Sequence, residues 1–159
     1  MSIIPQPRWL ELSSQASYYH RSGLSWRGIE PMKEAIDLLR QEPNHADRVA
    51  LKLNYLAHMY LAVGRLSEAE AVVREAMQIE NGQGKPASDS NLMTLAKILH
   101  QQGNCAEAVR LGRQALAKMR KYHGWGSDYY RQSKKVVASF KKPPVPRPAQ
   151  PEPAGRGAA

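Results

Sequence analysis

Residues 53–76 read LNYLAHMYLAVGRLSEAEAVVREA, a sequence that contains two helical patterns separated by a glycine. In the first pattern, apolar residues recur at helical spacing from Leu53 to Tyr60. Gly64 interrupts this pattern, and Ser67, followed by a glutamate three residues later, has the form of a capping box that starts a helix. The stretch therefore predicts a helix, a tight turn and a second helix.

The chain contains three copies of one spacing pattern: a small residue, a large apolar residue three positions later, and an alanine twelve positions after the first. The copies begin at Gly23, Ala57 and Ala96, so they are offset by 34 and 39 residues. Each copy predicts one helix pair, and we expect three stacked pairs. In the first pair, Pro31 suits the opening turn of a helix. In the third pair, Gly112 replaces a large residue and predicts a thin spot in the packing.

A final helix is expected after the third pair, with Ser127 as its N-cap and with Tyr129, Val136 and Phe140 packed against that pair. From Pro143 the chain is rich in proline and lacks aromatic residues, which predicts an extended, disordered tail. The sequence thus divides into an N-terminal extension (1–13), a repeat region (14–122, with pairs at about 16–49, 50–88 and 89–122), a basic capping helix (123–142) and the tail (143–159).

The composition and charge of the chain limit the classes of protein to which it can belong. The 159 residues include 42% hydrophobic residues, which argues for a packed core rather than wholesale disorder. We expect no membrane span and no secretory signal, because no apolar run is long enough for either. The single cysteine, Cys105, cannot form an internal disulfide, and a reducing, cytoplasmic setting is expected. The net charge is +9, and residues 118–159 contribute +8 of it.

The repeats resemble tetratricopeptide repeats. The residues that carry this resemblance are Leu56, Ala57, Tyr60, Gly64, Ala69 and Ala76 in the second pair, and Leu95, Ala96, Gly103, Ala108 and Ala115 in the third. Residues 53–57 and 64–70 are similar to the kinesin-light-chain-like branch of the family. The resemblance implies an all-α, right-handed solenoid with a groove lined by the first helix of each pair. It also implies an adaptor or scaffold that binds a peptide segment of another protein, and not an enzyme.

The groove face is expected to be cationic and free of carboxylates, and therefore suited to a peptide with some acidic character. Asn54 is the strongest candidate for contacting the peptide backbone, because an amide side chain can donate and accept at once. A solvated polar residue is the equal alternative for Asn54, and a solvated charge is the alternative for each cation. The candidate groove residues are Arg21, Asn54, Tyr55, His58, Lys97 and His100.

Catalytic motifs do not emerge from the sequence, and we expect no enzyme, no cofactor and no metal site. His20, His58 and His100 project to the groove face, but they come from different repeats and no carboxylate accompanies them. Lys85 follows a glycine in a loop, yet Pro86 stands where a phosphate-binding loop needs Ser or Thr.

The basic C-terminal segment, residues 118–142, allows two interpretations. Terminal repeats need a polar outer face, so its lysines fit a capping helix, and this is the favoured interpretation. The alternative is a nucleic-acid-associated protein, because aromatic residues alternate with the cations of the segment. The candidate nucleic-acid contacts are Arg131, Lys134, Lys135, Lys141 and Lys142. Neither the partner nor the oligomeric state can be derived from the sequence.

Overall fold

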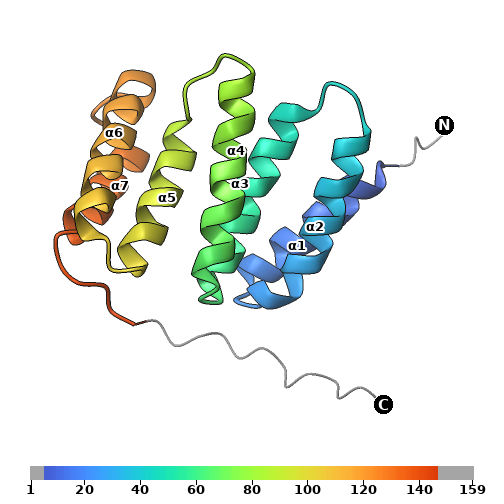
Figure 1. Ribbon diagram of the computed structural model, residues 1–159, viewed down its shortest axis with the longest axis horizontal. Coiled ribbons are helices and arrows are strands. Elements are labelled where there is room, and N and C mark those ends of the chain that lie inside the picture. The colour runs from blue at the N-terminus through green and yellow to red at the C-terminus, as the bar shows by residue number, and fades with distance from the viewer. Residues whose placement is uncertain (1–5, 147–159) are drawn as a thin grey trace.

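The computed structural model describes residues 6–146, and every regular element in that range is an α-helix (Figure 1). Residues 1–5 of the expected N-terminal extension and residues 147–159 of the expected tail lie outside the described range. The all-α prediction is confirmed. The helices are α1 (Arg8–Arg21), α2 (Ser25–Gln41), α3 (Ala46–Ala62), α4 (Leu66–Gly82), α5 (Asp89–Gln101), α6 (Cys105–His123) and α7 (Asp128–Ser139).

The helices form three consecutive pairs, α1 with α2, α3 with α4 and α5 with α6, and α7 packs on α6 (Figure 1). The backbone of α3 lies close to both α1 and α5, whereas within residues 6–146 the backbone of α4 approaches neither α2 nor α6, and α4 meets α2 through the Arg40–Glu75 ion pair. The first helices of the pairs therefore converge and the second helices diverge. We call the side formed by α1, α3 and α5 the inner face and the opposite side the outer face.

One glycine follows the first helix of each pair. Gly23, Gly64 and Gly103 have positive φ angles of 74°, 81° and 87°, a backbone conformation that favours glycine. In each turn, the residue after the glycine donates its backbone N–H to the carbonyl five positions earlier; the Arg65 N–H, for example, donates to the Tyr60 carbonyl. The three turns are therefore structurally equivalent.

This equivalence corrects the register expected for the first repeat. Gly23 corresponds to Gly64 and not to Ala57, so the offset between the first two pairs is 41 residues and not 34. The residue that corresponds to Ala57 and Ala96 is Ala16, and all three alanines are fully buried. Helix α1 consequently begins at Arg8, and part of the expected extension (1–13) is helical.

Small residues at the helix crossings allow close approach of the two helices in each pair. Ala57 on α3 and Ala69 on α4 are both fully buried, as expected for this crossing. In the first pair the position of Ala69 is taken by Gly28, where a Cβ atom would lie 2.8 Å from the Ala16 carbonyl oxygen. The α1–α2 pair is therefore too close to accept even an alanine there.

Two of the expected helix starts are wrong. Helix α4 begins at Leu66 with no side-chain cap, and Ser67 lies within the helix. An ion pair between Arg65 and Glu68 bridges this helix start instead. Pro31 lies in the interior of α2, six residues beyond its first residue, Ser25, and not in the opening turn. The expected cap at Ser127 is confirmed, because its hydroxyl accepts from the Tyr130 N–H.

Helix α7 covers the position that was expected to be a thin spot. Val137 and Phe140 pack directly over Gly112, where a Cβ would lie 2.7 Å from Val137 Cγ2. The space left by the absent side chain at Gly112 is thus filled by α7 and is not a void. Tyr130, and not the expected Tyr129, is the buried aromatic residue at the start of α7.

Candidate functional site

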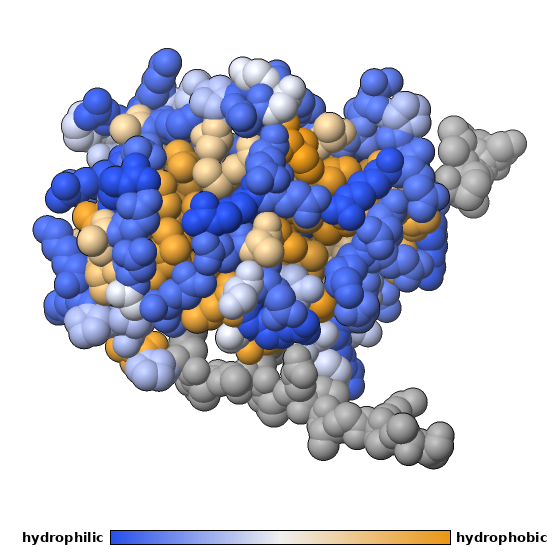
Figure 2. Space-filling model, viewed as in Figure 1, coloured by the Kyte–Doolittle hydropathy of each residue, from blue (hydrophilic) through white to orange (hydrophobic). Residues whose placement is uncertain are grey.

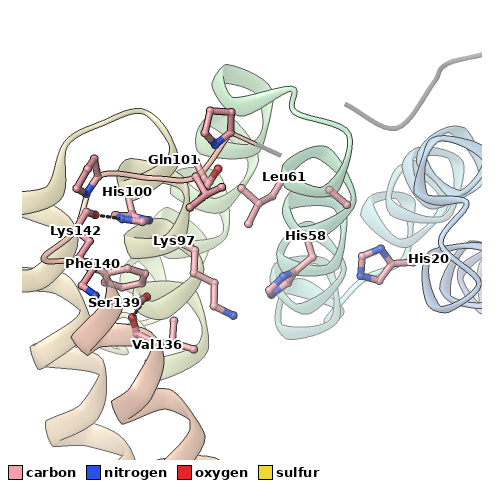
Figure 3. A pocket seen from close by; sticks show the side chains of 14 residues that line it. His20, His58, Leu61, Lys97, His100, Gln101, Val136, Ser139, Phe140 and Lys142 are labelled. Atoms are coloured by element: carbon pink, nitrogen blue, oxygen red, sulfur yellow. Dashed lines mark hydrogen bonds between the residues drawn. The ribbon is translucent and has the colours of Figure 1, made fainter. Parts of the chain in front are cut away.

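A cavity with a volume of about 840 Å³ lies on the inner face. Side chains from α1, α3, α5 and α7 line it, so it crosses all three helix pairs (Figure 3). The chain that follows α7, residues 141–146, forms one end of the cavity and is called the strap below. No carboxylate side chain is among the lining residues in the described part of the chain. We call this space the inner-face cavity.

Three nitrogen-bearing side chains meet in the inner-face cavity: His20 from α1, His58 from α3 and Lys97 from α5 (Figure 3). Burial is the main cause that lowers the pKa of His58 to about 4, and the nearby Lys97 and then His20 make smaller contributions to this shift. Burial also lowers the pKa of His20, whose Nδ1 lies 2.9 Å from the Ser25 hydroxyl. At neutral pH both imidazoles are uncharged, and Lys97, together with Lys142 of the strap, supplies positive charge.

Hydrogen bonding fixes the orientation of His58. Its Nε2 atom lies 3.1 Å from the Thr94 hydroxyl oxygen, and that hydroxyl donates to the Ser90 carbonyl at 2.9 Å. Since a hydroxyl has one hydrogen to donate, the Thr94 oxygen accepts from His58 Nε2. This arrangement places the proton of neutral His58 on Nε2 and leaves Nδ1 as an acceptor.

Asn54 lies beneath the inner face in a buried polar network between α3 and α5. Its amide nitrogen donates to Asn91 Oδ1 at 2.7 Å and to the Thr94 hydroxyl at 3.0 Å. The Ser90 hydroxyl lies 3.4 Å from the Asn54 carbonyl oxygen. Asn54 is only 7% exposed, so contact with a peptide would require these bonds to break. Asn54 joins two repeats, a role that its position in the sequence did not indicate.

His100 holds the strap in place. Its Nε2 atom lies 2.7 Å from the Lys142 carbonyl oxygen, and its ring packs on Phe140 at 5.0 Å between centroids. The ring is 8% exposed, so it forms part of the wall and offers little surface to a ligand. The strap then places Pro143 and Val145 along the cavity. This wall was not predicted from the sequence, although Pro143 marks where the helix must end.

The six predicted groove residues separate into two sets. His58, Lys97 and His100 line the inner-face cavity together with His20, whereas Arg21, Asn54 and Tyr55 do not. Tyr55 is 43% exposed and lies 5.8 Å from the Lys52 ammonium group, and Arg21 is exposed at the end of α1. Leu61, Val136 and Phe140 add apolar surface to the inner-face cavity.

The five basic residues predicted as nucleic-acid contacts are divided between α7 and the strap. Arg131 forms an ion pair with Asp128, and Lys134 and Lys135 are exposed in the middle of α7. Lys141 and Lys142 follow α7, and Lys142 lines the inner-face cavity.

Comparison with protein families matches residues 47–121 to the tetratricopeptide repeat. Residues 47–121 carry tetratricopeptide repeats. The matched segment covers α3 to α6, and the equivalent turn at Gly23 shows that α1 and α2 are built in the same way. No curated protein matches the chain in sequence. The likeness to the kinesin-light-chain-like branch is compatible with this match and stays a prediction.

Tetratricopeptide repeats generally mediate protein–protein interactions, and this all-α fold is typically a non-enzymatic scaffold. The repeats here present the inner-face cavity on the face that their first helices share. Within residues 6–146 there is no group of three or more His, Cys, Asp or Glu side chains placed to hold a metal ion. None of the described helices is both long enough and apolar enough to span a membrane.

Proposed function

We propose that the inner-face cavity binds an extended peptide segment of a partner protein, and that the protein acts as an adaptor or scaffold. The observation that carries the proposal is the inner-face cavity itself, which four helices and the strap line, with no carboxylate among its lining residues in the range 6–146. Because the inner-face cavity crosses several repeats, it suits an extended peptide better than a compact ligand.

The charge in the inner-face cavity favours a segment with at least one acidic side chain. Lys97 and Lys142 are cations there, and His20 and His58 are neutral at pH 7, so a carboxylate gains an ion pair and meets no like charge among the described lining residues. His58 Nδ1 supplies an acceptor for a peptide N–H.

Apolar surface lies beside these polar groups. Leu61 from α3 and Val136 from α7 line the inner-face cavity together with Val145 of the strap. A peptide segment that places an aliphatic side chain near an acidic one would match both the apolar surface and the positive charge of the inner-face cavity. Because few polar groups fix the orientation, this apolar surface should supply much of the binding free energy.

A selection of displayed random peptides tests this function. Peptides would be selected on the wild-type protein and then measured against Lys97→Glu and Leu61→Arg, with Lys33→Glu on the outer face of α2 as the charge-matched control. We expect selected peptides that contain Asp or Glu next to aliphatic residues and that lose about tenfold or more in affinity for both cavity variants. Peptides that bind all four proteins equally would contradict the proposal.

A further inference from the structure

The corner at which α6 ends and α7 begins exposes aromatic rings. Tyr122 is 69% exposed and Trp125 is 64% exposed, although Trp9 in the core is only 8% exposed. The corner lies at the end of α7 opposite the strap, so it is separate from the inner-face cavity (Figure 1). Large aromatic side chains left in water beside one another commonly mark a binding surface.

Cations surround these rings. The Arg120 guanidinium lies 4.7 Å from the Trp125 ring centroid, and the Lys121 ammonium lies 5.6 Å from the Tyr122 ring. Arg113 and Arg120 also border a small hollow of about 180 Å³ whose floor includes Tyr130.

The positive charge at this corner is largely uncompensated. Between residues 105 and 146 the carboxylates are Glu107 and Asp128, and each forms an ion pair with a neighbouring arginine of its own helix. One further carboxylate, Asp89 of α5, faces His123 at 3.8 Å. Arg113, Lys118, Arg120, Lys121, Lys134 and Lys135 form no ion pair within the described residues.

A capping role explains only part of this surface. The last helix of a solenoid needs a polar outer side, which Lys134 and Lys135 provide. It does not need an exposed tryptophan, or an arginine stacked on that tryptophan. Figure 2 shows hydrophilic residues spread over the face of the repeats in view, so much of the solvated surface is made of such residues.

We propose that the α6–α7 corner binds single-stranded nucleic acid. The cations contact phosphates, and unpaired bases stack on Trp125 and Tyr122. A duplex would use the cations only, because its bases are already stacked. An acidic protein segment would likewise leave the rings without planar partners, so the single strand matches both features of the corner. This activity is independent of peptide binding in the inner-face cavity.

Fluorescence polarisation with labelled oligouridine of about 12 nucleotides tests the proposal. We expect Trp125→Ala to weaken binding by about tenfold, with a smaller loss for Tyr122→Ala. Lys134→Glu with Lys135→Glu should weaken binding and reduce its dependence on salt. The matched control is Lys33→Glu with Arg40→Glu on α2, which removes the same charge at the other end of the molecule and should retain more affinity. Circular dichroism would verify that each variant is folded.

The proposal would be overturned by equal affinity of Trp125→Ala and wild type, because binding would then be purely electrostatic. Equal losses in the two charge-reversal variants would overturn it as well, since net charge and not the corner would then govern binding. Tighter binding of polyglutamate or of the matching duplex than of the single strand would instead identify an acidic protein or a duplex as the ligand.

Discussion

The amide nitrogen of Asn54 lies 2.7 Å from the side-chain oxygen of Asn91, and this bond joins the second repeat to the third. The same nitrogen also donates to Thr94, which in turn contacts His58 on the inner face. The contacts that hold adjacent repeats together thus also fix a side chain of the inner-face cavity. Stability and binding are connected through this network.

Asn54→Ala should destabilise the protein, because it leaves Asn91 and Thr94 buried without one of their partners. The expected loss in the free energy of unfolding is about 1–3 kcal/mol. Urea denaturation followed by circular dichroism would measure it. The exposed Asn81, at the end of α4, provides the control: Asn81→Ala should change the unfolding free energy by less than about 0.5 kcal/mol. Equal effects of the two substitutions would contradict the role assigned to the network.

Protonation of His58 should destabilise the fold in acid. The folded state lowers the pKa of His58 from 6.5 to about 4, so the unfolded chain binds more protons between these two pH values. The free energy of unfolding should therefore fall as the pH is lowered through this range, with a contribution from His58 of about 3 kcal/mol.

Comparison with His58→Gln isolates this contribution, because glutamine does not titrate. Urea denaturation of both proteins between neutral pH and pH 4 should show a shallower loss of stability in the variant. The burial of His20, which also lowers its pKa, leaves part of the slope in both proteins. Parallel curves for the two proteins would show that His58 is not held neutral by the fold.

Gly112→Ala should displace α7. The new Cβ would lie 2.7 Å from one methyl carbon of Val137 and 3.1 Å from the other, so rotation of the valine gives no relief. The expected cost is about 1–3 kcal/mol, in spite of the better helix propensity of alanine. The double variant Gly112→Ala with Val137→Ala should recover part of this loss in a double-mutant cycle of unfolding free energies. Additive losses would mean that the two residues do not contact each other.

His100→Phe should release the strap, because phenylalanine keeps a ring against Phe140 but cannot donate to the Lys142 carbonyl. Limited trypsin digestion should then cleave after Lys141 faster than in the wild-type protein, as read by mass spectrometry of the fragments. Cys105→Ala is the control, since its sulfur lies 3.8 Å from the same carbonyl and contributes little. Unchanged cleavage of His100→Phe would show that other contacts hold the strap.

The helix pairs could be predicted from the sequence because their signals are local. Gly64 and Gly103 follow apolar helical patterns directly, and Ala57 and Ala69 are small at the position where the two helices cross. The register of the first repeat could not be predicted in this way, because Gly23 occupies a turn but has the same spacing to later residues as Ala57, which lies within a helix.

The candidate site is formed by contacts between residues that are distant in the sequence. The spacing of residues along the chain does not predict such contacts. Asn54 meets Asn91 across 37 residues, and His100 meets Lys142 across 42. Each candidate could be placed on a helix face, but its partners could not be predicted. The burial of polar residues such as Asn91 and Thr94 is therefore not evident from the sequence.

The central claim is that the inner-face cavity binds a peptide, and chemical-shift mapping tests it most directly. A selected acidic peptide would be titrated into ¹⁵N-labelled protein, and the amide shifts would be followed in two-dimensional spectra. The account predicts the largest shifts at His58, Leu61 and Lys97, with little change along the outer side of α2 and α4. Shifts concentrated on α2 and α4, with the amides of α3 and α5 unaffected, would contradict it.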